Sequence, residues 1–190
     1  MANVTIIGKG TMGQAIAAVA GRGGHNVQLV GKEDAAPPTG DIIVLAVPYG
    51  AVSDVIARHG EALAGRIVVD ITNPLNFETF DSLTVPADSS AAAEIAAALP
   101  GSKVLKAFNT TFAATLASGR VGDLTTTVLI AGDDADAKST LAGVIASGGL
   151  TAVDAGGLQR ARELESLGFL QIGLAAGEKI SWTGGFGLIA

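Results

Sequence analysis

The feature that most constrains this chain is a glycine-rich turn that directly follows its first β-branched run. The run covers residues 3–7, and Gly8, Gly10 and Gly13 come next in the spacing Gly-x-Gly-x-x-Gly, before an Ala-rich stretch that reaches Ala20. A strand, such a turn and a helix form the unit that binds the pyrophosphate of a dinucleotide, because the glycines admit the phosphates and the helix N-terminus offers N–H donors. The turn therefore predicts a doubly wound α/β fold with a dinucleotide site.

The rest of the chain continues to alternate strand and helix patterns. Strands are predicted at residues 4–7, 27–30, 42–47, 67–71, 104–108, 126–130 and 151–154. Helices are predicted at residues 12–20, 51–58, 90–99, 135–146 and 158–176, with Ser89 or Ser90 and Asp133 or Asp134 as N-caps. This alternation indicates an α/β, Rossmann-type doubly wound and mostly parallel sheet with a C-terminal helix and tail.

One connection departs from a regular doubly wound fold. Residues 31–40 separate the second and third predicted strands and contain Pro37 and Pro38. Two prolines remove most of the hydrogen bonds that a short helix would need, so we expect an extended connection across the sheet edge.

Length and composition favour a single domain. A chain of 190 residues suits one well-buried core, and 48% hydrophobic against 16% charged residues fits a sheet covered on both faces. The net charge of -6 and the lack of a Lys/Arg cluster argue against nucleic acid as a partner. No leader pattern and no apolar run of about 18 residues appears, so no membrane partner and a cytoplasmic location are expected.

Metal chemistry is not indicated. The chain has no Cys, and its two His residues, His25 and His59, fall in patterns typical of a loop or a helix end. We interpret both as solvated or locally hydrogen-bonded groups, and we expect no metal site.

The residues after the second predicted strand favour NADP(H) over NAD(H). NAD sites usually place a carboxylate there to bind the ribose 2′-hydroxyl, whereas this chain has Gly31 followed by Lys32. Gly31 leaves room for a 2′-phosphate and Lys32 offers it a cation, although Glu33 would oppose that charge unless it turns away.

Ligands in such sheets bind at the carboxyl ends of the strands, near the point where the strand order reverses. Besides the turn itself, we therefore expect the cofactor to contact three later strand ends. The predicted cofactor-binding residues are Gly8, Lys9, Gly10, Thr11, Met12, Gly13, Gly31, Lys32, Ala46, Val47, Pro48, Tyr49, Asn73, Pro74, Ala107, Phe108 and Asn109. Core packing is an alternative for Phe108, as is a turn role for Asn73 and Asn109.

No catalytic acid or base is predicted. Tyr49 is the only tyrosine and has no lysine one helical turn beyond it, and Lys106 and Asp70 lie within strand patterns where pairing or edge exposure is expected. This absence suggests an acceptor whose own ring takes the hydride and exchanges its proton with water, such as a flavin or a deazaflavin.

Over nearly its whole length the chain resembles the NADPH-dependent deazaflavin (coenzyme F-420) reductases. This family belongs to the same Rossmann group as the cytosolic domains of membrane metalloreductases. The resemblance rests on the turn with Met12 and on residues 45–49, 68–75, 106–110, 132–134, 154–156 and 162–167. It implies NADP(H), with the deazaflavin F-420 as the second substrate. FMN and FAD are the flavins that the missing acid or base leaves as alternative second substrates. It also implies NADPH contacts at Thr11, Met12, Gly31, Lys32, Val47, Pro48 and Ala107, with Asn73, Asn109 and Leu174 near the second ring.

Two features depart from that family. The 31–40 connection is shorter than the helix-containing segment usual there, and Lys32 stands where an arginine is often found. The Asn73 and Asn109 turns also differ from those of well-known deazaflavin reductases, so the second substrate need not be F-420.

The resemblance implies a homodimer, with residues from about 157 to 190 contributing to the second-substrate pocket or to the dimer contact. The tail holds Trp182 and Phe186, whose apolar area we expect to pack on this chain or on a second copy. Two alternatives remain open. One is a non-enzymatic NADP(H) sensor, and the other is a reductase of the β-hydroxyacid or pyrroline carboxylate type, which the short C-terminal part disfavours.

Overall fold

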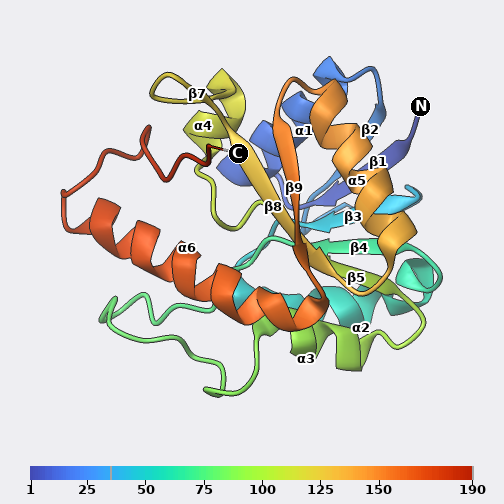
Figure 1. The fold of residues 1–190 in the computed structure, drawn as a ribbon. Helices are drawn as coiled ribbons and strands as arrows, with labels where there is room; N and C mark the ends of the chain where they lie inside the picture. The colour runs from blue at the N-terminus through green and yellow to red at the C-terminus, as the bar shows by residue number, and fades with distance from the viewer. Residues whose placement is uncertain (35, 190) are drawn as a thin grey trace.

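The computed structural model describes residues 1–34 and 36–189, and a seven-stranded sheet runs through its centre (Figure 1). In spatial order the strands are β2 (Asn26–Val30), β1 (Asn3–Ile7), β3 (Ile42–Leu45), β4 (Ile67–Asp70), β5 (Lys103–Lys106), β8 (Thr127–Gly132) and β9 (Thr151–Gly156). The first five strands in this order are mutually parallel, β8 runs antiparallel to β5, and β9 is parallel to β8. The strand order reverses beside β1, and this places the switch point next to the glycine turn.

Helices cover both faces of the sheet. The main helices are α1 (Thr11–Arg22), α2 (Val52–Leu63), α3 (Ala91–Ala98), α4 (Ala113–Ser118), α5 (Ala135–Ser147) and α6 (Ala161–Ala176). One buried cluster joins α1, α4 and α5 to one face, and a second joins α2 and α3 to the other. In Figure 1 the orange α6 runs past the lower end of β9 and above the green α3.

Alternation along the strands produces these two cores. Ile6 and Val44 point into the α1 side, whereas their neighbours Ile7 and Ile43 point into the α2 side. Successive side chains of a strand face opposite ways, so strands buried on both faces need continuous apolar runs. The doubly wound, mostly parallel sheet predicted from the sequence is confirmed.

All seven predicted strands occur in this sheet, with some shifted ends. The strands predicted to reach Val47 and Phe108 end at Leu45 and Lys106. One further backbone hydrogen bond extends each, from Ala46 N to Ile7 O (2.8 Å) and from Ala107 N to Asp70 O (3.1 Å). Beyond Ala107 the chain turns out of the sheet, because Phe108 has a φ of 62°.

The helix predictions need three corrections. The pattern at 158–176 divides into a 3₁₀ turn, η2 (Leu158–Arg160), and α6. His59 lies inside α2 and is buried, so its predicted place in a loop or at a helix end is wrong. Helix α4 and the small hairpin of β6 (Arg120–Val121) and β7 (Leu124–Thr125) were not predicted, because each is too short to show a period.

The two predicted N-caps are confirmed. Ser90 and Asp134 cap α3 and α5 by accepting hydrogen bonds from Ala93 N (3.1 Å) and Ala137 N (2.8 Å). The described residues of the 31–40 connection contain no helix, and Gly40 N bonds to Thr5 Oγ1 (2.8 Å) along the sheet edge. No helix in the described part of the chain has both the length and the hydropathy needed to cross a bilayer.

The C-terminal tail folds back on its own chain. The Trp182 ring lies 5.0 Å from that of Phe112, measured between centroids, and Phe186 N donates to Gln171 Oε1 (3.3 Å). Figure 1 shows the red tail passing from the end of α6 toward α4 and β7. The predicted packing of the tail is therefore confirmed within this chain.

Candidate functional site

The glycine turn is shaped by backbone that passes too close for side chains. Gly8 has a φ of +120°, and a Cβ there would collide with the carbonyl oxygen of Ala46 on the neighbouring strand end. A Cβ on Gly13 would collide with the carbonyl oxygen of Gly8, whereas a Cβ on Gly10 would meet nothing within 4 Å. Gly8 and Gly13 thus hold the turn closed, and Gly10 leaves the space in front of α1 open.

The front of α1 presents N–H groups to that space. Gly10 is its N-cap in extended backbone, and the first helical bond runs from Gln14 N to Gly10 O (3.0 Å). The N–H groups of the first turn therefore point forward without intrahelical acceptors, and the first turn of α1 holds no acidic residue. Together with the positive end of the helix dipole, this makes the turn an anion site.

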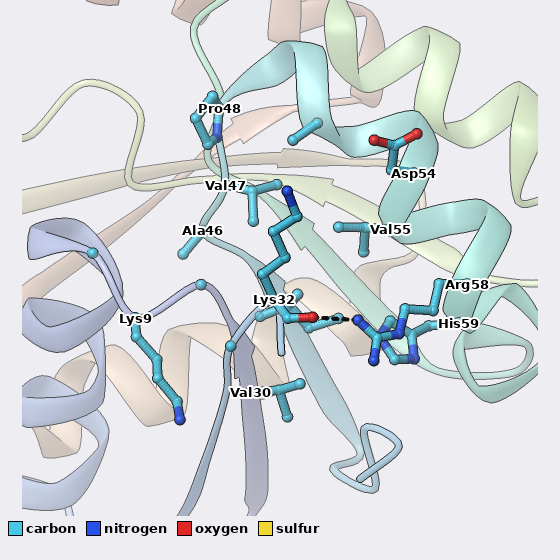
Figure 2. Close-up of a pocket in the computed structure, with 15 residues that line it drawn as sticks. Lys9, Val30, Lys32, Ala46, Val47, Pro48, Asp54, Val55, Arg58 and His59 are labelled. Atoms are coloured by element: carbon cyan, nitrogen blue, oxygen red, sulfur yellow. Dashed lines mark hydrogen bonds between the residues drawn. The ribbon is translucent and has the colours of Figure 1, made fainter. Parts of the chain in front are cut away.

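A first cavity of about 450 Å³ opens on one side of the turn, and its lining residues are drawn in Figure 2. Its walls come from the turn, from the ends of β2 and β3, and from α2. The lining residues are Ile7, Gly8, Lys9, Gly10, Val30, Gly31, Lys32, Ala46, Val47, Pro48, Ala51, Asp54, Val55, Arg58 and His59. Eight of the predicted cofactor residues are therefore brought together here.

The cations of the first cavity have different partners. Lys9 pairs with Asp34 (2.7 Å), and this ion pair, followed by the Gly31 N–H, holds the pKa of Asp34 below its usual range. Arg58 donates to the carbonyl oxygens of Lys32 and Asp34, and Figure 2 draws the bond to Lys32. Within residues 1–34 and 36–189, neither Lys32 nor Arg58 has a carboxylate partner in the ion pairs of this structure.

Asp34 places a carboxylate at the end of the second strand, although the sequence has Gly31 at that position. Its Oδ2 accepts from Gly31 N (2.8 Å), close to the place where an NAD site holds an acidic residue. Lys9 compensates that charge, so the carboxylate does not leave the cavity electronegative.

Sequence reasoning missed Arg58 and His59. Both belong to α2, which follows the third strand, whereas the dinucleotide fingerprint concerns the first two strands. Burial, and then the neighbouring Arg58, lower the pKa of His59, so its ring is neutral near pH 7. The signal in the sequence that could have indicated Arg58 is its positive charge on the helix that follows the third strand.

A second cavity of about 460 Å³ opens on the other side of the α1 N-terminus, and its walls are mostly apolar, with five aromatic side chains among them. It is lined by Thr11, Met12, Ile71, Asn73, Phe77, Phe80, Phe108, Asn109, Thr111, Phe112, Ala113, Ala114, Ile172 and Trp182. Five predicted site residues, Thr11, Met12, Asn73, Phe108 and Asn109, therefore meet here. The two cavities share the front of α1, because Gly10 lines the first and Thr11 lines the second.

Two asparagines are hydrogen-bonded to each other in the wall of the second cavity. Asn73 Nδ2 donates to Asn109 O (2.8 Å), and Asn109 Nδ2 donates to Asn73 Oδ1 (2.9 Å) and to Leu164 O (2.8 Å). Gly168 of α6 packs directly on this pair, where a Cβ would collide with Asn73 Oδ1. The Asn109 side chain is buried, and its Oδ1 has no hydrogen-bond partner among the described residues.

A buried ionic cluster holds α6 beside these asparagines. Lys106 Nζ lies 2.8 Å from Asp70 Oδ2 and 2.8 Å from Glu165 Oε1, and all three side chains have at most 1% exposure. Glu165 also accepts from Ala91 N (3.0 Å) and Ala92 N (3.3 Å), at the front of α3. Burial raises the pKa of Glu165, against the opposing effect of Lys106. Of the two roles expected for Lys106 and Asp70, pairing or edge exposure, the structure shows pairing, with Glu165 as an unforeseen third member.

The remaining predicted residues, in the described part of the chain, line neither cavity. Tyr49 lies between α2 and α3, where its hydroxyl donates to Glu94, and burial raises its pKa above the usual value. Ala107 is fully buried in the core, and Pro74 is buried with its carbonyl oxygen accepting from Thr84. On α6, Ile172 lines the second cavity, and Leu174 is not among its lining residues in the described chain.

Comparison with known proteins relates the chain to one group of oxidoreductases. The model of the family described as NADP oxidoreductase, coenzyme F420-dependent, matches residues 21–74. The F420-dependent NADP reductase of Methanocaldococcus jannaschii is 31% identical over 166 residues, which cover 85% of this chain and 74% of the relative.

A mammalian relative and a solved structure extend the comparison. Metalloreductase STEAP3 of Rattus norvegicus is 36% identical over 107 residues, which are 56% of this chain and 21% of that protein. A crystal structure from Arthrobacter sp. FB24, described as a candidate F420-dependent NADP-reductase, superposes with a TM-score of 0.83 at 26% identity and covers 100% of both chains. The similarity therefore spans the entire fold of the chain.

Proposed function

The chain belongs to the family of F420-dependent NADP oxidoreductases, and we propose that it transfers hydride between NADPH and a flavin-like acceptor, either a deazaflavin or a flavin. The observation that supports this most is the pair of cavities that meet at the front of α1. The first has cations among its lining residues, and the second has five aromatic side chains and no charged one among its described lining residues. A dinucleotide lying across the front of α1 would have one half in each.

The glycine turn fits a pyrophosphate. Gly10 lines the first cavity, and the open space in front of it would be filled by any larger side chain. The forward N–H groups of α1 suit the two phosphates, as does the lack of a carboxylate in its first turn. We therefore place the pyrophosphate over Gly10, Thr11 and Met12.

We place the adenosine half in the first cavity, with its 2′-phosphate between Lys32 and Arg58. Figure 2 shows the Lys32 side chain extending toward Val47 and Pro48, while Lys9 points away from it. The guanidinium of Arg58 approaches from the α2 side, and guanidinium groups bind phosphate through several N–H donors. These two cations outnumber Asp54, the one carboxylate among the described lining residues, and favour NADPH over NADH, while Lys9 compensates the charge of Asp34.

The nicotinamide half then enters the second cavity past Thr11 and Met12. When bound, NADPH supplies a hydride from C4 of its nicotinamide to the acceptor ring and leaves as NADP⁺, while the reduced ring takes up a proton from water. None of the described residues that line this cavity carries a carboxylate, an imidazole or an amine. The protein's part is therefore to bind, to align two rings and to exclude water, rather than to move a proton.

Stopped-flow mixing under anaerobic conditions tests the proposal. NADPH is mixed with the protein and with F-420, riboflavin, FMN or FAD, and nicotinamide absorbance is followed. We expect oxidation of NADPH with at least one of these rings, faster than with NADH. If no ring oxidises NADPH although the protein binds it, the proposal is wrong.

We further propose that two copies pair through α6 and the tail. Leu170 on α6 is 54% exposed, and Phe186, Leu188 and Ile189 are exposed in the tail. Apolar side chains gathered in this way are typical of an interface between subunits. Light scattering should give the mass of a dimer, and Leu170→Glu should shift it to the mass of a monomer.

A further inference from the structure

The walls of the second cavity concentrate the aromatic residues of the chain. Five of its eight aromatic side chains line this one space, namely Phe77, Phe80, Phe108, Phe112 and Trp182. Phe108 and Phe112 form the buried end, whereas Phe77, Phe80 and Trp182 are 59%, 38% and 53% exposed at the mouth. Exposed rings around a hollow of this size suit a flat aromatic ligand that stacks on them.

The described lining residues carry no charge, whereas the segments next to the mouth aromatics carry a net negative charge. The segments that carry the mouth aromatics contain Glu78 and Asp81 beside Phe77 and Phe80, and Glu178 and Lys179 before Trp182. Hydrogen bonds from Thr79 and then Ser82 lower the pKa of Asp81, so it is ionised at neutral pH. Three carboxylates against one ammonium give a mouth that opposes an anionic ligand.

A buried acceptor atom points to a second property of the ligand. Asn109 lines this cavity with 5% exposure, and its Oδ1 has no hydrogen-bond donor in the described residues, while its Nδ2 has two acceptors. Leaving a buried carbonyl oxygen without a donor costs free energy, so a ligand N–H is favoured once a small turn of the Asn109 side chain opens this atom, which has less than 1 Å² of accessible surface, to the cavity.

We propose that the hydride acceptor is an uncharged flavin-type ring without a phosphate, and that its ring N–H donates to Asn109 Oδ1. This proposal rests on the proposed function, because it concerns which acceptor the same site takes. The flavin tricycle is flat and aromatic, and it carries an N–H on its pyrimidine ring, which a quinone lacks. Riboflavin and lumiflavin represent this class, whereas FMN has the same ring and adds a phosphate.

The charge preference is tested with riboflavin and FMN, which share a ring and differ in the phosphate. We expect kcat/KM with NADPH to be at least about threefold higher for riboflavin at low ionic strength, and the ratio to shrink with added salt. If FMN reacts as fast as riboflavin or faster, the inference is wrong while the proposed function stands. If no ring is reduced at all, the proposed function itself fails.

The source of the charge preference is tested by neutralising the mouth. The double variant Glu78→Gln/Asp81→Asn should raise kcat/KM for FMN and narrow its ratio to riboflavin. Asp88→Asn is the matched control, since Asp88 is an exposed carboxylate on the same connection but is not next to a lining aromatic. Equal ratios in the double variant and in the wild type would contradict the role of these carboxylates.

The hydrogen bond is tested by changing the ligand rather than the protein, since Asn109 also helps to hold α6. Lumiflavin and its N3-methyl derivative differ in the N–H that Asn109 would accept. We expect methylation to lower kcat/KM about tenfold without changing the Kd for NADPH. Equal rates for the two compounds would overturn the assignment of Asn109.

Discussion

Gly8 has a backbone conformation and surroundings that only glycine tolerates. Its φ is +120°, and a Cβ would collide with Ala46 O, so the turn depends on the absence of a side chain. Gly143 offers a contrast, since it lies in the middle of α5 and a Cβ there would meet nothing within 4 Å.

The first prediction is that Gly8→Ala lowers the free energy of unfolding by at least about 2 kcal/mol and abolishes detectable NADPH binding. Denaturant titration and calorimetric binding measure the two effects. The control Gly143→Ala should instead stabilise the protein by about 0.5–1 kcal/mol, since alanine is the better residue inside a helix. A Gly8→Ala protein that binds NADPH normally would contradict the structure of the turn.

Arg58 is the residue with which we test the preference for NADPH. Arg58→Ala should weaken NADPH binding between about tenfold and a hundredfold and leave the Kd for NADH nearly unchanged, because only NADPH carries the 2′-phosphate. The control is Arg66→Ala, which removes a surface arginine paired with Asp41. Equal weakening of both dinucleotides would show that Arg58 acts by holding the connection at Lys32 and Asp34 rather than by binding phosphate.

At the scale of elements, Lys106 ties β4, β5 and α6 together, and through Glu165 it also reaches α3. A single ammonium compensates two carboxylates in the interior, so its loss would leave both without a cation. This cluster fixes the position of Gly168, one turn further along α6, against the Asn73–Asn109 pair.

We predict that Lys106→Met lowers the free energy of unfolding by about 3–5 kcal/mol, since an unpaired charge would remain buried. The matched control is Lys103→Met on the same strand, where the ammonium pairs with Asp134 at the surface. Exposed pairs contribute little, so the control should unfold close to wild type in urea. The role assigned to the cluster is wrong if the two variants are equally stable.

Asp134 gives an element-scale prediction on pH. The Ala137 N–H and then the Lys103 ammonium lower the pKa of Asp134 below its usual 3.8. Its contribution is therefore complete above about pH 4 and is lost as the pH falls through the folded-state pKa. Asp134→Ala should lower Tm at pH 7, and the difference from wild type should shrink in acid. Asp136→Ala, on the same turn without a capping bond, should lower Tm less.

At the scale of the whole molecule, the sequence predicts the fold but not the sites that residues far apart in the chain form together. All seven strands and the binding turn follow from apolar runs and glycine spacing, because these signals are local. The direction of β8 does not follow from the sequence, since a strand buried on both faces shows an apolar run whether it is parallel or antiparallel to its neighbour. Nor does the second cavity, because Phe77, Phe112 and Trp182 come together only when the loop after β4, the start of α4 and the tail are in place.

Site residues whose position depends on distant packing were also mispredicted or missed. Tyr49 was predicted from its position after a strand end, but the 3₁₀ turn η1 (Tyr49–Ala51) carries it to the far side of α2, where Glu94 binds it. Arg58 lies thirteen residues after the end of β3, yet it reaches the segment that follows β2 through Lys32 and Asp34. A sequence pattern gives strand ends, whereas the reach of a long side chain depends on the packing of the helix.

A molecule-wide prediction follows from ligand linkage. NADPH at about 100 times its Kd should raise the free energy of unfolding by about 2.7 kcal/mol, and for a domain of this size Tm should rise by roughly 5–11 °C. Differential scanning fluorimetry measures the shift. NADH at the same concentration should give a smaller rise, and identical shifts would argue against recognition of the 2′-phosphate.

The contact of Trp182 with Phe112 gives the protein an intrinsic optical probe. The chain has one tryptophan, so all indole emission comes from the mouth of the second cavity. Reduced nicotinamides and flavins both absorb where indole emits, so each ligand arriving there should quench that emission by energy transfer. The order in which the two ligands bind could then be followed in real time, without a label and before any electron has moved.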